Sequence, residues 1–121
     1  MHNVRAIRGA TTAMANTKDA IRESVDELLD KIEKENNFNP EDIVSVIFTT
    51  TSDLDAIFPA AIARRRPQWK YVPLLDVQQM HVAGSLDSCI RVLIQINSTQ
   101  HQDKIKHIYL RRAKYLRSDL I

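Results

Sequence analysis

The sequence has little of what several protein classes require. It contains one cysteine, Cys89, and two glycines among 121 residues. A single cysteine excludes an intramolecular disulfide scaffold and a zinc site built on several thiolates. No apolar run approaches the roughly 20 residues needed to span a bilayer, and the first residues lack the apolar stretch of a secretory signal. We therefore expect a cytoplasmic protein that does not enter a membrane.

Motifs of common enzyme classes are also missing. The sequence has no GxSxG, HExxH, P-loop or GxGxxG motif, and Gly9 and Gly84 are too few to build a loop that cradles phosphates. His81, His101 and His107 are not spaced as a compact set of metal ligands. The sequence therefore predicts no nucleotide cofactor and no metal.

The composition is that of a single globular domain over residues 1–121, with 44% hydrophobic and 26% charged residues. The charge is uneven, because residues 17–42 hold nine acids and four bases whereas residues 56–121 hold eleven bases and four acids. The acidic excess is expected to be a solvated helix face, and the basic half favours an anionic ligand. Nucleic acid is a poor candidate, because aromatic residues make up only 6% and no RNA- or DNA-binding motif occurs.

Hydrophobic periodicity predicts the order strand, helix, strand, helix and three further strands. Apolar and β-branched runs predict strands over 4–10, 43–48, 69–75, 89–96 and 107–110. The helical spacing of apolar residues from Ile21 to Ile32 predicts a helix that begins at Asn16 and ends before Pro40. A shorter helix is expected over 55–66. These elements predict an α+β fold, with helices packed on a mixed β-sheet.

Two arginines at strand positions are the most informative residues. Arg91 lies in the middle of the apolar strand 89–96, and Arg8 lies at the end of the first strand. A guanidinium keeps its charge at any ordinary pH and needs acceptors wherever it is buried. Together with Tyr109, these arginines are candidates to bind a carboxylate, which matches the guanidinium fork. A salt bridge to a protein carboxylate, or a side chain facing solvent, is the alternative.

Several segments carry a resemblance to a known family: 5–12 (RAIRGATT), 53–60 (DLDAIFPA), 72–73 (VP), 78–80 (QQM), 89–92 (CIRV), 107–110 (HIYL) and 116–117 (LR). In this order and spacing they resemble the monofunctional AroH-type chorismate mutases over nearly the whole chain. The resemblance implies a homotrimer of pseudo-α/β-barrel architecture. It also implies conversion of chorismate to prephenate by a Claisen rearrangement, without a cofactor, in arginine-rich clefts between subunits.

The same resemblance implies roles for individual residues. Arg8 and Tyr109 resemble the groups that hold a substrate carboxylate, and Arg91 resembles the donor to the ether oxygen and a neighbouring carboxylate. With Gln79, the two arginines are the implied catalytic residues. The other residues implied to form the cleft are Phe58, Ala60 and Arg64 from a neighbouring subunit, Leu75 and Asp76 in the lining, and Leu116 and Arg117 in a tail that closes over it.

The sequence departs from the family pattern at three positions. Gln79 stands where the family pattern has a glutamate that contacts the substrate ring hydroxyl. Asp76 stands where the pattern has a cysteine near that glutamate, and Ala61 stands where it has a lysine. The Gln79 amide can accept the same hydrogen bond but lacks the negative charge that favours positive character in the ring. Asp76 is either a replacement acceptor or a carboxylate that points away, and Arg65 or Arg66 is a candidate replacement for the lost cation.

A pericyclic rearrangement needs neither a nucleophile nor a general base, so a sequence without such motifs agrees with this activity. Two rival functions stay open on the sequence alone. One is a Rid-type imine deaminase, which resembles this family in trimeric architecture and in its use of an intersubunit arginine, although its motifs are absent. The other is a non-catalytic module that binds chorismate or prephenate, which the glutamine at position 79 makes plausible.

Overall fold

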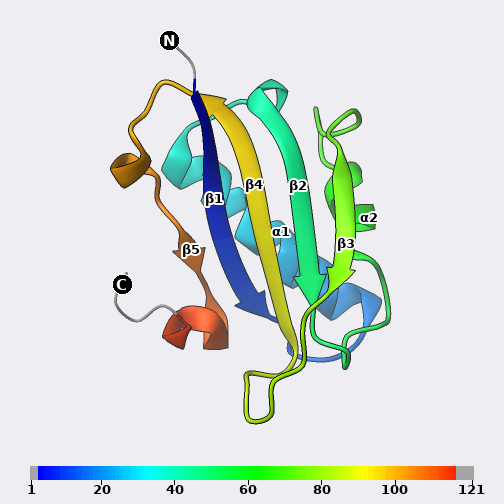
Figure 1. Ribbon diagram of the computed structural model, residues 1–121. Helices are drawn as coiled ribbons and strands as arrows, with labels where there is room; N and C mark the ends of the chain where they lie inside the picture. Colours follow the sequence, from blue (N-terminus) through cyan, green and yellow to red (C-terminus); the bar gives the residue numbers. More distant parts are fainter. Residues whose placement is uncertain (1–2, 117–121) are drawn as a thin grey trace.

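A computed structural model describes residues 3–116 of the chain (Figure 1). Its strands are β1 (Asn3–Thr12), β2 (Ile43–Thr50), β3 (Leu74–Gln78), β4 (Cys89–Ser98) and β5 (Ile108–Tyr109). Its α-helices are α1 (Lys18–Asn36) and α2 (Pro59–Arg64), and short 3-10 turns η1 (Pro40–Asp42), η2 (Gln102–Lys104) and η3 (Arg111–Tyr115) complete the chain. Within the described residues, neither helix is long and apolar enough to cross a membrane.

The five strands form one mixed sheet in the order β3-β2-β4-β1-β5. The central strand β4 pairs antiparallel with both β1 and β2, whereas β2 pairs in parallel with β3 and β1 in parallel with β5. The predicted α+β class, mixed sheet and element order are therefore confirmed. The run 89–96, whose alternate residues are buried, is the middle of the sheet.

Helix α1 forms where the apolar stripe predicted it. Its buried side chains include Ile21, Val25 and Ile32, which recur at helical spacing. The cap differs from the prediction, because the side chain of Thr17, not Asn16, accepts the hydrogen bond from the Ala20 N–H. Asn16 instead accepts from the backbone N–H groups of the segment that leads to α2, at Asp55 and Ala56.

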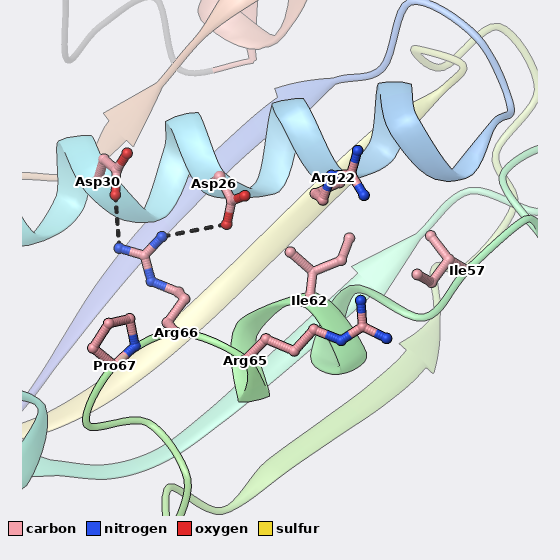
Figure 2. A pocket seen from close by; sticks show the side chains of 8 residues that line it. All are labelled: Arg22, Asp26, Asp30, Ile57, Ile62, Arg65, Arg66 and Pro67. Atoms are coloured by element: carbon pink, nitrogen blue, oxygen red, sulfur yellow. Dashed lines mark hydrogen bonds and ion pairs between the residues drawn. The ribbon is translucent and has the colours of Figure 1, made fainter.

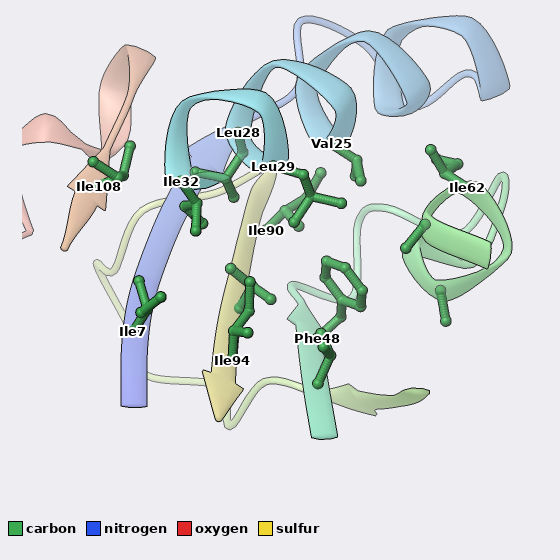
Figure 3. Packing of buried hydrophobic residues seen from close by; sticks show 14 of the residues in the cluster. Ile7, Val25, Leu28, Leu29, Ile32, Phe48, Ile62, Ile90, Ile94 and Ile108 are labelled. Atoms are coloured by element: carbon green, nitrogen blue, oxygen red, sulfur yellow. The ribbon is translucent and has the colours of Figure 1, made fainter. Parts of the chain in front are cut away.

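Both helices cover the same face of the sheet, and the hydrophobic core lies between the helices and the sheet (Figures 1 and 3). Ile7, Phe48 and Ile94, from three different strands, point from the sheet into this core and are fully buried. Gly9 allows the close approach of α1, because a Cβ atom there would lie 2.8 Å from Ile32 Cδ1 and 3.0 Å from Val92 Cγ1. The opposite face of the sheet carries neither α1 nor α2, and the 3-10 turn η3 packs against its β1–β5 edge through Ala113.

Two predicted boundaries were wrong. The third strand runs over Leu74–Gln78 rather than 69–75, because the chain makes turns through Trp69 and Val72 before Pro73, which has no N–H to donate. Trp69 is buried at these turns, and its indole Nε1–H donates to Glu33 on α1 at 2.9 Å. The second helix is shorter than 55–66 and begins at Pro59.

The acidic and basic halves of the sequence meet in the fold. Arg66 donates to Asp30 at 2.7 Å and also pairs with Asp26 and Glu33 of α1, and Arg111 pairs with Glu27 at 3.0 Å. The acidic side chains of α1 are largely exposed, as expected of a solvated face, and several of them also pair with these arginines. No local sequence pattern indicates this pairing, because the partners are more than 30 positions apart.

Candidate functional site

The face of the sheet opposite the helices carries one row of side chains across four strands. In the strand register Thr49 on β2 is opposite Arg91 on β4, Arg91 is opposite Ala10 on β1, and Ala10 is opposite Tyr109 on β5. Neighbouring strands are about 4.8 Å apart, so the small Ala10 leaves space between the side chains of Arg91 and Tyr109. This row forms the floor of a pocket.

The pocket has a volume of ≈ 280 Å³, and the side chains that line it include Arg8, Arg91 and Tyr109. Arg8 lies one row further along the open face, opposite Leu93. Arg8 is exposed, Arg91 is half-buried and Tyr109 is buried. No Asp or Glu of the described chain lines this pocket. Two cations and a phenol hydroxyl without an opposing carboxylate suit a ligand that bears carboxylate groups.

Several polar atoms at this pocket are buried and unsatisfied. Within residues 3–116, Arg91 Nε, Tyr109 OH and Thr49 Oγ1 have no hydrogen-bond partner although each is closed off from solvent. Buried polar groups are nearly always hydrogen-bonded, because leaving one unpaired costs about 1–3 kcal/mol. Three such atoms around one pocket indicate a polar site that is incomplete in the isolated chain.

The chain segments around the pocket are held by contacts outside it. Tyr109, Ala10 and Ala113 form a small buried cluster against which Leu116 packs, so Leu116 lies beside one of the residues that line the pocket. The backbone N–H of Arg8 donates to His107 Nδ1 at 2.9 Å, which ties the first strand to the segment before β5. Arg117, the other predicted residue of the tail, lies outside the described residues.

A second group of predicted residues lies at the far edge of the sheet, around the start of α2. A pocket of ≈ 660 Å³ there is lined by Phe58, Ala61, Arg65 and Asp76, among other residues. Phe58 is 69% exposed and stands at the rim of this pocket. Of the two arginines proposed to replace the missing lysine, Arg65 is the one that lines this pocket beside Ala61.

Asp76 points toward α2 and away from Arg91. Its carboxylate accepts a hydrogen bond from the backbone N–H of Ala60 at 3.0 Å. Burial raises the pKa of Asp76 above its ordinary value, although the Ala60 hydrogen bond and the charge of Arg64 act in the opposite direction. Ala60 itself is buried, Arg64 is exposed, and Leu75 projects onto the open face with 58% of its surface exposed.

Gln79 lies at the end of β3 in a third pocket of ≈ 190 Å³, formed with the loop of residues 80–87. Its backbone N–H donates to the Thr50 carbonyl at 2.8 Å, and its side-chain Oε1 is buried without a partner in the described part of the chain. Asp53 holds the end of this loop by accepting from the Ser88 N–H at 2.8 Å. The backbone of Gln79 is therefore fixed by a hydrogen bond, and its side-chain Oε1 is free to accept one.

The structure thus brings Arg8, Arg91, Tyr109 and Leu116 together, and it separates them from Phe58, Ala60, Arg64 and Asp76. The sheet lies between the guanidinium of Arg91 and the carboxylate of Asp76, because the two side chains leave opposite faces. Sequence reasoning missed Thr49, which lines the same pocket as Arg91. The cross-strand register that makes them neighbours is not readable from the sequence.

A further hollow of ≈ 370 Å³ lies between α1 and α2, and Arg65 and Arg66 of the arginine run 64–66 line it (Figure 2). Figure 2 shows the Arg66 guanidinium turned toward Asp26 and Asp30, and its centre lies 5.7 Å from the Trp69 ring. Arg66 therefore fastens α2 to α1, and it is excluded as the replacement for the missing lysine. Its role is to stabilise the fold.

The buried thiol of Cys89 does not offer a nucleophile. Cys89 is fully buried, and burial raises the pKa of its thiol despite the nearby charge of Arg91. Among residues 3–116, no three His, Cys, Asp or Glu side chains lie close enough together to hold a metal ion. The described side chains can supply positive charge and hydrogen-bond donors, which is what binding and polarising an anion requires.

Comparison with known proteins agrees with this chemistry. The profile of the family "Chorismate mutase type I" matches residues 4–120. The chain is 43% identical over 117 residues to chorismate mutase AroH of Bacillus subtilis strain 168, with 97% of this chain and 92% of the relative covered. It is 44% identical over 118 residues to chorismate mutase AroH of Thermus thermophilus, with 97% and 96% covered.

A solved structure shares the fold. The chorismate mutase from Clostridium thermocellum superposes with a TM-score of 0.87 at 44% sequence identity, and the match covers 90% of this chain and 96% of that one. Profile, sequence identity and fold agree over nearly the full length. The chain belongs to the type I, AroH-type chorismate mutase family.

Proposed function

We propose that this protein converts chorismate to prephenate. The observation that carries the proposal is the pocket on the open face of the sheet, where Arg8, Arg91 and Tyr109 converge. Chorismate is a flexible dianion with two carboxylates and a bridging ether oxygen. The pocket offers two guanidiniums and a hydroxyl to such a molecule, and no carboxylate of the described residues repels it. Membership of the chorismate mutase family supports the same substrate.

The rearrangement asks little of the protein beyond shape and charge. The substrate must fold into a compact chair-like conformer, and its ether oxygen gains negative charge as the bond to the ring breaks. In our proposal Arg8 and Tyr109 hold a carboxylate, and Arg91 donates to the ether oxygen and the carboxylate beside it. A fixed donor aimed at developing charge is worth about 3–4 kcal/mol of barrier, or roughly 10²–10³ in rate, and holding the reactive conformer adds an entropic share.

We further propose that the site is completed by a neighbouring copy in a homotrimer of pseudo-α/β-barrel form. Three observations support this assembly. The open face exposes apolar side chains, with Ile47 at 36%, Val77 at 45% and Leu75 at 58%. Phe58 is also largely exposed, beside a pocket that contains neither Arg8 nor Arg91. Arg91 Nε, Tyr109 OH and Thr49 Oγ1 lack partners among residues 3–116.

In this arrangement Phe58, Ala60 and Arg64 of one copy form a wall over the arginines of the next, with Leu75 and Asp76 in the lining. Leu116 and Arg117 close the cleft as a tail. The Asp76 carboxylate is engaged by the Ala60 N–H, so its role is to fix the start of α2 rather than to accept from the substrate. Gln79 accepts a hydrogen bond from the ring hydroxyl through its free Oε1, and we expect the protein to act in the cytoplasm.

The test is direct: chorismate is added to the purified protein, its ultraviolet absorbance is followed, and the product is identified by mass and by its chromatographic position. Loss of chorismate with formation of prephenate supports the proposal. Binding of chorismate without turnover would identify the non-catalytic module instead. Release of ammonia from an imine, without activity on chorismate, would identify the deaminase.

A further inference from the structure

Thr49 stands directly beside the central arginine. The two residues are opposite each other in the antiparallel pairing of β2 with β4, and both line the pocket on the open face. Side chains directly opposite on one face of an antiparallel pair have Cβ atoms about 4.5–5.5 Å apart. The Thr49 hydroxyl is therefore within reach of the inner part of the Arg91 side chain.

Both residues keep an unsatisfied polar atom at this contact. Thr49 Oγ1 and Arg91 Nε are each closed off from solvent and have no hydrogen-bond partner among residues 3–116. Nε is the innermost nitrogen of the guanidinium, nearer the backbone than the two terminal nitrogens. A ligand that enters the pocket meets the terminal nitrogens first, so Nε needs an acceptor from the protein.

The residue opposite Thr49 on its other side does not supply a polar partner. On its outer side in the row lies Val77 of β3, whose side chain is apolar. Tyr109 is three strands away, which is about 14 Å at the usual strand spacing. Arg91 is thus the residue with a donor that the register places directly opposite Thr49 in this row.

We propose that Thr49 is a positioning residue for Arg91. Its hydroxyl accepts the Nε–H when the substrate draws the guanidinium into its working orientation, which leaves the terminal N–H groups for the ether oxygen and a carboxylate. This inference rests on the proposed function. It assigns Thr49 no contact with the reacting atoms, and it predicts that loss of the hydroxyl disturbs the transition state more than substrate binding.

The test is a kinetic comparison of Thr49→Val, Thr49→Ser and Thr11→Val with the wild-type protein. Thr11 is a matched control because its buried Oγ1 also lacks a partner in the described chain, while its side chain belongs to the set that alternates with Ala10 and faces the helices. We expect kcat of Thr49→Val to fall about 10-fold with KM nearly unchanged, Thr49→Ser to restore it, and Thr11→Val to leave it unaltered.

A double substitution makes the test specific to the pair. Lysine has no Nε–H, so in the Arg91→Lys background Thr49→Val should lower kcat by less than about 2-fold, because the coupled contact is already lost. Full multiplication of the two losses, an unchanged kcat in Thr49→Val, or a loss confined to KM would overturn the inference. A wild-type protein that does not convert chorismate would instead contradict the proposed function, so the two failures are distinguishable.

Discussion

The two faces of the sheet are built for different tasks. The face toward α1 and α2 is apolar and closed, and Ile7, Phe48 and Ile94 on it are fully buried. The open face carries Arg8 and Arg91 among partly exposed apolar residues, and it keeps buried polar atoms without partners. Among residues 3–116, the unsatisfied buried atoms Thr49 Oγ1, Arg91 Nε and Tyr109 OH gather at one pocket of the open face, whereas Thr11 Oγ1 on the helix-covered face lies among apolar side chains.

This difference follows from the period of two along a strand, which sends consecutive side chains to opposite faces. On β2 the buried Phe48 is flanked by Ile47 and Thr49, and on β4 the half-buried Arg91 is flanked by the buried Ile90 and Val92. Adjacent residues therefore have different roles: one packs in the hydrophobic core and stabilises the fold, and the next lies on the open face, where a ligand or a neighbouring subunit can contact it. Substitutions at adjacent positions can separate the two.

The largest expected effect is on stability. Phe48→Ala removes a fully buried ring from the helix-covered face and should lower the free energy of unfolding by about 3–5 kcal/mol. Ile47→Ala, one residue earlier, should lower it by about 1 kcal/mol or less and weaken self-association instead. Urea denaturation at matched protein concentration and light scattering measure both. Equal losses of stability with unchanged assembly would contradict the division between the faces.

The next effect is on catalysis. Arg91→Lys keeps a cation on β4 but replaces a planar fork with a single ammonium, so it cannot contact the ether oxygen and a carboxylate together. Turnover should fall at least about 10²-fold with little change in melting temperature. Arg22→Lys, at an exposed position of α1 that pairs with Asp19, is the control and should stay within about 2-fold. A destabilised but active Arg91→Lys would make Arg91 structural.

A smaller effect is expected at Gln79. Its Oε1 already accepts without a competing partner in the described chain, so the amide can bind the ring hydroxyl but cannot favour positive charge in the ring. Gln79→Glu should raise kcat by a few-fold near neutral pH with a smaller change in KM. Steady-state kinetics decide the matter, and an unchanged or lower kcat in a folded variant would show that the amide meets the need of this site.

The smallest effect concerns pH. Burial raises the pKa of Asp76 in the folded protein, so folding favours the protonated form of its carboxyl group. The free energy of unfolding therefore falls as the pH rises through that pKa and the carboxylate ionises. Asp76→Asn keeps an oxygen that accepts from the Ala60 N–H. It should therefore raise the melting temperature slightly at neutral pH, and the gain should vanish below pH of about 4. A gain in melting temperature that grows toward acid pH would show that the pKa of Asp76 is lowered, not raised, by folding.

Much of the fold could be predicted because its signals are local. The apolar stripe of α1 and the β-branched run of β4 each lie within one short window of sequence. The third strand was misplaced because Trp69 and Val72 are residue types that are common in strands. In the structure a turn buries Trp69, and its indole N–H donates to Glu33. That contact joins residues 36 positions apart, so no local pattern reveals it.

The site was predictable in its residues but not in its layout. Arg91 and Arg8 were identified by a charge inside an apolar strand and by family resemblance. Their row with Thr49 and Tyr109 depends on the register of four strands, which the sequence does not encode in any short motif. The separation of Asp76 from the arginines likewise depends on which face of the sheet its side chain leaves, and Phe58 follows α2 to the far edge of the sheet.

We propose that the open face of one copy and the α2 region of the next form one site, and mixing two damaged proteins tests this arrangement. Arg91→Lys damages the first half and Arg64→Ala the second. After subunit exchange, an equimolar mixture should regain up to about a quarter of the wild-type rate, because random assembly joins two intact halves at one interface in four. A mixture of Arg91→Lys with Arg8→Ala, both in the first half, should regain nothing. If the first mixture is no more active than the sum of its parts, the site does not lie between copies.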